Sequence, residues 1–177
     1  LHNLSYGMYV ASSNKGDLLN GQIVNTVFQI TNDPVTIGVS VSNKNLTHEY
    51  IDSSRNFSLS ILGRDTPLLF IGKFGFRSGR DEDKFKGANF IKLASGVPVL
   101  LDHALCYIGA KIVKKLDCFT HTLFIGQMTE SKMLRDGIPM TYDYYHHEKH
   151  GTTPPSAPTF IKEEEPGAKR EVAMQKY

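Results

Sequence analysis

The stretch Val35-Thr36-Ile37-Gly38-Val39-Ser40-Val41-Ser42 decides the fold. Branched apolar residues alternate in it with small or polar ones, which is the two-residue period of a β-strand. One face of this strand is predicted to meet the core. The other face is predicted to meet something close-fitting, because glycine and serine leave space there. The next residues, Asn43-Lys44-Asn45-Leu46-Thr47-His48, lead from the strand end into a helix start.

The segments around this strand are also of β type. They are short, rich in Val, Ile, Phe and Thr, and bounded by Gly, Asn, Asp or Pro. They run from Tyr6 to Ser12, Gln22 to Thr31, Phe57 to Leu62, Ala104 to Leu116 and Thr120 to Met128.

Helix signals are few. Asn45 or Thr47 would cap a short helix over residues 48–53, and Pro67 would open a second over residues 68–74. Six strands with two or three short helices predict a mainly β protein, built as a small closed or partly closed barrel.

Composition limits the classes of function. Twenty Lys and Arg against 18 Asp and Glu give a formal net charge of +2, too balanced to indicate nucleic acid or an anionic membrane surface as a partner. No apolar run approaches the ~20 residues that span a bilayer, and the first residues lack the pattern of a secretory signal. The two cysteines, Cys106 and Cys118, are too few for a disulfide framework, so we expect a reducing, cytoplasmic setting.

The composition changes near Thr152. The run Thr-Thr-Pro-Pro-Ser-Ala-Pro-Thr is followed by Lys-Glu-Glu-Glu-Pro-Gly-Ala-Lys-Arg-Glu, and both are typical of linkers. We therefore place one folded domain at residues 1–161 and a charged linker at 162–177.

The usual catalytic motifs are missing from the sequence. It contains no Gly-x-Gly-x-x-Gly, no phosphate-binding loop ending in Gly-Lys-Ser/Thr and no Gly-x-Ser-x-Gly elbow. His146, His147 and His150 form the one histidine cluster. No carboxylate or thiolate pattern accompanies them, which favours a solvated loop over a metal site.

Three polar clusters remain, and each lies at the end of a predicted strand or helix. They run from Asn20 to Gln29, from Ser40 to His48 and from Phe76 to Phe85. Each alone is equally consistent with a solvated turn. Together they offer hydroxyls, Lys or Arg, and a helix N-terminus, which suit a phosphate joined to an aromatic ring system. This indicates a nucleotide or a flavin and does not choose between them.

Five runs in this order resemble the flavin reductase-like FMN-binding family, over about residues 5–161. They are residues 22–34, 39–48, 57–62, Ser78-Gly79-Arg80-Asp81-x-Asp83-Lys84-Phe85 and His121-Thr122-Leu123-Phe124-Ile125-Gly126. Within that family the chain is most similar to the flavin reductase domains of high-molecular-weight rubredoxins and to flavoredoxins. The resemblance implies a split β-barrel, a homodimer, noncovalent FMN near the subunit interface, and NADH or NADPH as hydride donor.

The resemblance also implies cofactor-binding residues, while no catalytic side chain and no metal ligand is expected. Residues along the ribityl chain and ring edge would be Asn25, Thr26 and Val27. Residues around the phosphate would be Ser42, Asn43, Lys44, Thr47 and His48. Residues that contact FMN or the nicotinamide nucleotide would be Ser78, Gly79, Arg80 and Lys84. His121 would approach the flavin ring as a hydrogen-bond donor, or be structural, and three tyrosines at 142, 144 and 145 would cover the pocket or pack on the barrel.

Electrons would leave toward rubredoxin and then a flavodiiron-type oxygen or nitric oxide reductase. The last residues, Met174-Gln175-Lys176-Tyr177, resemble the start of a rubredoxin, so we expect a fused rubredoxin domain to follow. One departure concerns Phe119, which stands where relatives often carry glycine and would narrow the surroundings of the flavin or cover one face of its ring.

Three other functions stay open from the sequence. The first is an FMN electron carrier that another protein reduces. The second is a barrel without a cofactor, in which the polar clusters are turns. The third is an enzyme like pyridoxamine-phosphate oxidase, which the Asp-Pro strand entry and the Ser-Gly-Arg-Asp loop fit less well.

Overall fold

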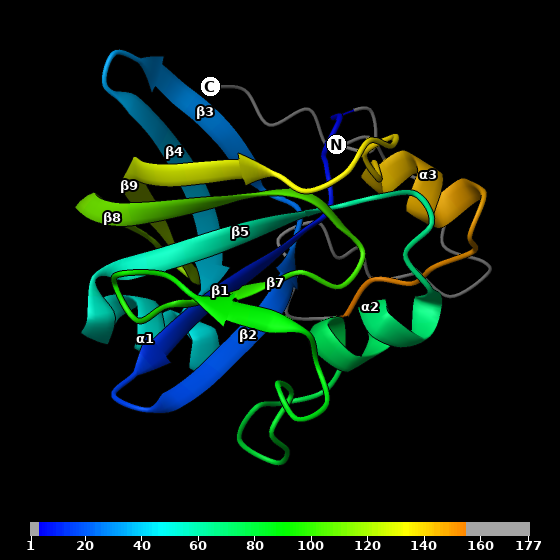
Figure 1. The fold of residues 1–177 in the computed structure, drawn as a ribbon, viewed down its shortest axis with the longest axis horizontal. Helices are drawn as coiled ribbons and strands as arrows, with labels where there is room; N and C mark the ends of the chain where they lie inside the picture. Colours follow the sequence, from blue (N-terminus) through cyan, green and yellow to red (C-terminus); the bar gives the residue numbers. More distant parts are fainter. Residues whose placement is uncertain (1–3, 155–177) are drawn as a thin grey trace, which may run out of the picture.

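The computed structural model describes residues 4–154, which form a large antiparallel sheet, a separate two-stranded sheet and short helices (Figure 1). Seven strands pair in the order β2-β1-β5-β8-β9-β4-β3. Their bounds are β1 Tyr9–Lys15, β2 Leu18–Val24, β3 Val27–Asn32, β4 Val35–Ser42, β5 Asn56–Leu62, β8 Ala104–Cys118 and β9 His121–Met133. The prediction of a mainly β split barrel is confirmed.

The chain connectivity forces this sheet to curl. β2 and β3 lie at opposite edges, yet only Asn25 and Thr26 separate the end of β2 from the start of β3. Two residues span at most about 10 Å, so the two edges must meet at this point. The N–H of Ser40 in β4 donates to the carbonyl of Thr26 at 3.1 Å, which ties the link to the far edge. The sheet therefore closes on itself at one place only, as a split barrel does.

The β4 strand has the two faces that its alternation predicts. Ile37, Val39 and Val41 are buried in the core. On the other face Gly38 lies against β3, where an added Cβ would come within 2.9 Å of the Phe28 ring. The close-fitting neighbours of Gly38 are therefore the Phe28 and Ile30 side chains of β3, the next strand in the same sheet.

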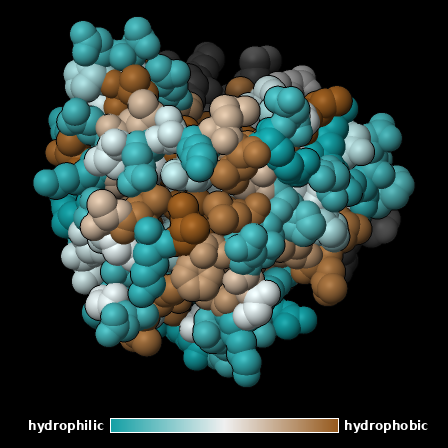
Figure 2. All heavy atoms as spheres, in the orientation of Figure 1, coloured by the Kyte–Doolittle hydropathy of each residue, from teal (hydrophilic) through white to brown (hydrophobic). Residues whose placement is uncertain are grey.

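Three hydrophobic clusters fill the described part of the molecule, and the smallest consists of Leu93, Val99 and Tyr107. The barrel interior is built around Phe57 and Phe124, both fully buried. A second cluster lies beneath α2 (Leu68–Gly75) and α3 (Tyr142–His147), and it centres on Phe74 and Met140. On the face drawn in Figure 2, apolar side chains gather toward the middle, over the strands, and polar ones surround them.

Several predicted element boundaries were wrong. The segment from Gln22 to Thr31 is two strands, because the chain breaks at Asn25–Thr26. The first strand starts at Tyr9 and continues to Lys15, and the α1 helix spans Leu46–Ser54 with Asn45 as its N-cap.

Three elements were not predicted. They are α3 and the short strands β6 (Phe90–Lys92) and β7 (Pro98–Leu100). β7 is held on the outer face of the barrel, where the buried hydroxyls of Ser58 and Ser60 donate to the carbonyls of Pro98 and Leu100 at 2.6 and 2.8 Å. The predicted domain end at residue 161, the linker at 162–177 and the expected rubredoxin start lie outside the described residues.

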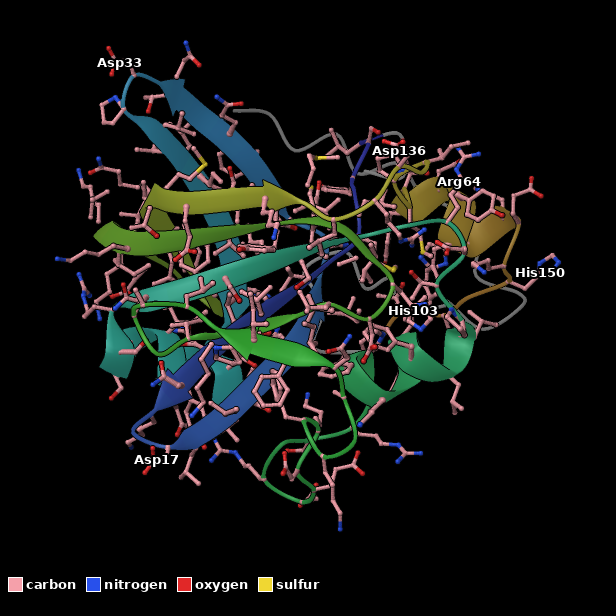
Figure 3. The ribbon with its side chains drawn as sticks, viewed as in Figure 1. Asp17, Asp33, Arg64, His103, Asp136 and His150 are labelled. Carbon is pink, nitrogen blue, oxygen red and sulfur yellow. The ribbon has the colours of Figure 1, made fainter. Side chains whose placement is uncertain are left out.

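Arg64, labelled in Figure 3, lies in the loop after β5 and contacts α3. The Arg64 guanidinium lies 4.5 Å from the centre of the Tyr144 ring and so ties the loop after β5 to α3. Cys106 and Cys118 are both free thiols. Among the helices of residues 4–154, none is both long and apolar enough to span a bilayer.

Candidate functional site

A cavity of about 230 Å³ lies between the end of β4, the strand β2, the N-terminal end of α1 and the loop that follows α2. α3 and residues 152–154 complete its wall. Its lining residues from the predicted set are Asn25, Ser42, Lys44, Thr47, Ser78, Gly79, Arg80, Lys84 and His121. These nine of the 13 predicted residues come from four separate segments of the chain, so the fold brings the polar clusters into one site.

The first wall is the turn from β4 into α1. Ser42 and Lys44 line the cavity there, and the Asn45 side chain makes no capping hydrogen bond to the helix. The N–H groups in the first turn of a helix have no acceptor within the helix, and the helix dipole adds partial positive charge at this end. Lys44 is exposed and forms no ion pair with any described residue. This wall can therefore take an anionic group.

The second wall is β2. Asn20 and Gln22 line the cavity although neither was predicted as a site residue. Asn20 is 2% exposed, and its Nδ2 donates to Thr47 Oγ1 at 2.9 Å. Gln22 Oε1 is buried and has no hydrogen-bond partner among the described residues. A buried amide oxygen of this kind suits a ligand that carries N–H or O–H donors.

The third wall is the loop after α2, from Phe76 to Lys84. The loop is polar and carries two arginines, and each pairs with a glutamate. Arg80 forms an ion pair with Glu49 of α1, and Arg77 pairs with Glu82 at 3.2 Å. The loop is thus linked to the first wall across the cavity.

Lys84 is the buried cation of this loop. It is 3% exposed, and its Nζ donates to the carbonyls of Arg77 at 3.2 Å and Phe74 at 3.4 Å. Burial lowers its pKa from 10.5 to about 8, and the Glu82 carboxylate opposes this shift. Carbonyls near the end of a helix attract a cation, so Lys84 anchors the base of the loop to α2 while it lines the site.

Asn25 and His121 lie at the closing point of the barrel. Asn25 is 5% exposed, and His121 pairs in register with Ser42 across β9 and β4. The His121 Nδ1 lies 2.8 Å from the Thr120 hydroxyl. Thr26 and Val27, which were expected beside Asn25, are not among the lining residues: Thr26 donates to the Asn25 side chain, and Val27 packs on the barrel core.

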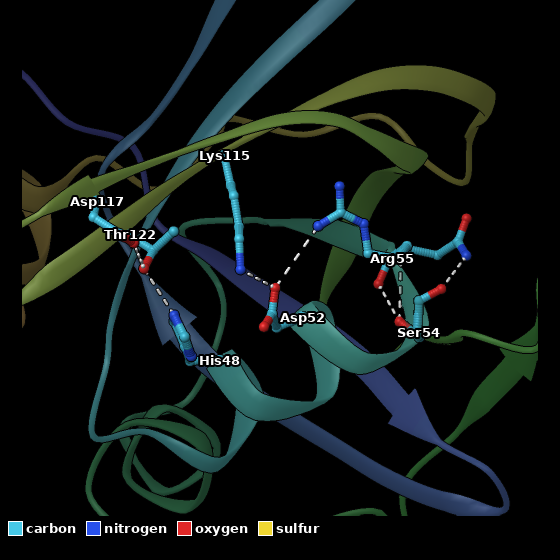
Figure 4. Close-up of polar contacts among 8 residues, drawn as sticks. His48, Asp52, Ser54, Arg55, Lys115, Asp117 and Thr122 are labelled. Atoms are coloured by element: carbon cyan, nitrogen blue, oxygen red, sulfur yellow. Dashed lines mark hydrogen bonds and ion pairs between the residues drawn. The ribbon is translucent and has the colours of Figure 1, made fainter.

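His48 and Asn43 also lie outside the cavity lining. His48 Nε2 is 2.8 Å from the hydroxyl of Thr122 (Figure 4). That hydroxyl also lies 3.0 Å from Asn43 Oδ1. Asn43 Nδ2 donates to the carbonyl of Phe119 at 3.1 Å. These two residues join the first wall to the β8–β9 turn, so they support the site from behind.

Burial lowers the pKa of His48 below 6.5, and Lys115 acts in the same direction, while Asp52, Asp117 and Glu49 oppose it. His48 therefore takes up a proton near pH 6.5 in the unfolded chain, but only at a lower pH in the native protein. We therefore expect the free energy of unfolding to fall as the pH drops below 6.5, and His48→Gln to reduce this dependence. Urea unfolding of the parent and of His48→Gln between about pH 8 and about pH 5 measures this pH dependence. Identical pH profiles would contradict the assignment.

Of the remaining aromatic residues that the sequence suggested, some line the cavity and others do not. Tyr142 and Tyr145 line the cavity, whereas Tyr144 stacks with Arg64. The Phe119 side chain is fully exposed at the tip of the β8–β9 turn and is not among the lining residues, so the expected narrowing of the site by Phe119 is not seen.

The donor set fits a flavin mononucleotide. The first wall offers a cation and helix N–H groups for a phosphate, and β2 offers amides for hydroxyl or ring N–H groups. Apolar side chains of Ile23, Val24, Ile71 and Phe74 also line the cavity and can lie against a ring. Among residues 4–154, no group of three or more His, Cys, Asp or Glu side chains could hold a metal ion.

Comparison with known proteins also indicates a flavin-related domain. The model of the flavin reductase like domain matches residues 1–153. The chain is 52% identical over 160 residues to the high molecular weight rubredoxin of Moorella thermoacetica, covering 90% of this chain and 70% of that protein. It is 40% identical over 161 residues to the ferric-chelate reductase (NAD(P)H) of Archaeoglobus fulgidus, covering 91% and 95% of the two chains.

Among solved structures, the flavoredoxin of Methanosarcina acetivorans superposes with a TM-score of 0.69 at 18% identity, over 76% of this chain and 74% of that one. At this identity the likeness concerns the fold alone. The family match covers every wall of the cavity up to residue 153, and two curated relatives agree with it. The chain therefore belongs to the flavin reductase like domain family.

Proposed function

We propose that this chain binds FMN noncovalently in the cavity, takes hydride onto it from NADH or NADPH, and passes the electrons to rubredoxin. The observation that carries the proposal is the meeting, in one cavity, of a helix N-terminus that no side chain caps with Lys44, the amides of β2 and the polar loop after α2. When bound, the flavin supplies the redox chemistry, and the protein supplies binding and orientation.

In this proposal each wall has one task. Ser42, Lys44 and the first turn of α1 bind the phosphate, with Thr47 behind them. Asn25 and His121 lie along the ribityl chain and the ring, and Gln22 accepts from a flavin donor. The loop residues Ser78, Gly79, Arg80 and Lys84 close the other side, toward the nicotinamide nucleotide. Orientation of donor and acceptor is worth on the order of 7 kcal/mol or more of barrier in well-positioned reactions, so no acid or base is needed.

The partners in the proposal follow from the relatives. The protein with 52% identity is named a high molecular weight rubredoxin, which supports rubredoxin as acceptor. The relative with 40% identity is named for NAD(P)H, which supports a nicotinamide donor. We further propose a homodimer, a flavodiiron-type oxygen or nitric oxide reductase at the end of the chain of carriers, and a cytoplasmic setting, in keeping with two free thiols.

An anaerobic titration tests the proposal. The purified protein should carry the visible absorption band of oxidised flavin, and NADH or NADPH should bleach it within seconds. Oxidised rubredoxin, added in excess because it accepts one electron while reduced FMN carries two, should then restore the band. Protein that takes up no FMN would overturn the proposed site. Bound FMN that neither nucleotide reduces would instead favour the electron carrier that another protein reduces.

A further inference from the structure

Asn20 lies where three walls of the cavity meet. It belongs to β2, it is 2% exposed, and it lines the cavity. Its Nδ2 donates to Thr47 Oγ1 in α1 through a buried bond of 2.9 Å. Thr47 is itself fully buried and also lines the cavity, so this bond joins two residues of the cavity wall. A buried amide donor that loses its acceptor is costly, so the pair fixes α1 against β2.

The other side of the Asn20 amide, its Oδ1, faces the loop after α2 at Gly79. A Cβ added at Gly79 would lie 2.1 Å from Asn20 Oδ1 and 2.8 Å from Cγ. Gly79 does not have a positive φ, so glycine is required here for space. The backbone of the loop therefore rests directly on Asn20, beside β2 (Figure 1).

A second link joins the same two walls but is weaker. Arg80 forms an ion pair with Glu49, and both side chains are more than 40% exposed. Exposed ion pairs contribute little to stability, because water and salt screen them. The spacing between α1 and the loop is therefore set mainly by Asn20, which touches both.

We propose that Asn20 is a positioning residue that sets the distance between the helix wall and the loop after α2, so that both can bind one FMN molecule. This inference rests on the proposed function, because it assumes that FMN is the ligand that the two walls share. In it, Asn20 acts on the site through its hydrogen bond to Thr47 in α1 and its contact with Gly79 in the loop.

The test is a double-mutant cycle of Asn20→Ala and Gly79→Ala, with FMN affinity measured by quenching of FMN fluorescence. We expect each single variant to bind FMN about fivefold to tenfold more weakly, since a coupling of about 1 kcal/mol corresponds to that range. The double variant should bind no more weakly than Asn20→Ala alone, because the added methyl group then has nothing to strike. Gly72→Ala in α2 is the matched control, since an added Cβ there has open space.

Hydrogen exchange of residues 76–84 in the FMN-free proteins gives an independent readout. Exchange there should be faster in Asn20→Ala than in the parent, and unchanged in Gly72→Ala. If the parent binds no FMN, the proposed function fails, and the exchange data still decide whether Asn20 holds the loop. If the parent binds FMN while Gly79→Ala binds it equally well, or the two substitutions simply add, the positioning role is wrong.

Discussion

Lys44→Ala is expected to weaken FMN binding by about tenfold to hundredfold, because a hydrogen bond to a charged group contributes about 1.5–3 kcal/mol. Lys44 lines the cavity beside the first turn of α1, and no described carboxylate competes for it. Fluorescence quenching of FMN measures the affinity directly. Raising the salt concentration should weaken the parent more than the variant, since ions screen an exposed charge.

Riboflavin separates a phosphate contact from damage to the fold. It has the same ring and ribityl chain without the phosphate. Lys44→Ala should therefore bind riboflavin with an affinity within about twofold of that of the parent protein. Lys111→Ala, on the exposed side of β8, is the control for loss of a surface charge. An equal loss for both flavins would place Lys44 away from the phosphate, and no loss for either would remove it from the site.

The sequence predicted those strands whose alternation is decided locally. β4 was predicted from Val35 to Ser42 as observed, because each of its residues follows the pattern of its face. The break at Asn25–Thr26 was missed because it contains neither glycine nor proline and lies within a continuous β-type run. Only the closing of the barrel, through contacts with β4, requires a turn there.

Elements that depend on tertiary contacts could not be predicted. β7 has three residues, and the serine hydroxyls of β5, about 40 positions away, hold it. The α3 helix has a run of tyrosine and histidine with modest helix propensity, and its start is fixed by Thr141, whose hydroxyl accepts from the N–H of Tyr144.

The candidate site was predictable as a set of loops and less so residue by residue. Side chains in the turn from β4 to α1 alternate between the cavity and the β8–β9 turn, so Lys44 lines the cavity whereas Asn43 and His48 contact the other side. That choice depends on the helix orientation, which the sequence does not give. Asn20 and Gln22 lay within a polar cluster of the sequence, and a buried amide in a strand was the signal that could have identified them.

Lys84→Met is expected to change the pH dependence of stability more than any other substitution considered. Native Lys84 has a pKa of about 8, against 10.5 for the unfolded chain, because burial disfavours the ammonium. Between these values the unfolded state binds more protons, so the free energy of unfolding of the parent should rise with pH from about 8 to 10.5. A shift of this size corresponds to about 3 kcal/mol.

The variant should lose this rise, since methionine has a similar volume and no proton to release. At neutral pH it should be at least as stable as the parent, because a buried charge is replaced by an apolar side chain. Its FMN affinity should nevertheless fall by about tenfold, since the carbonyls of Phe74 and Arg77 lose the donor that orders the loop. Urea unfolding at several pH values, with the exposed Lys86→Met as control, measures the first effect and FMN titration the second. A variant that keeps the rise would show that Lys84 is not the group that titrates, and one that binds FMN like the parent would make Lys84 purely structural.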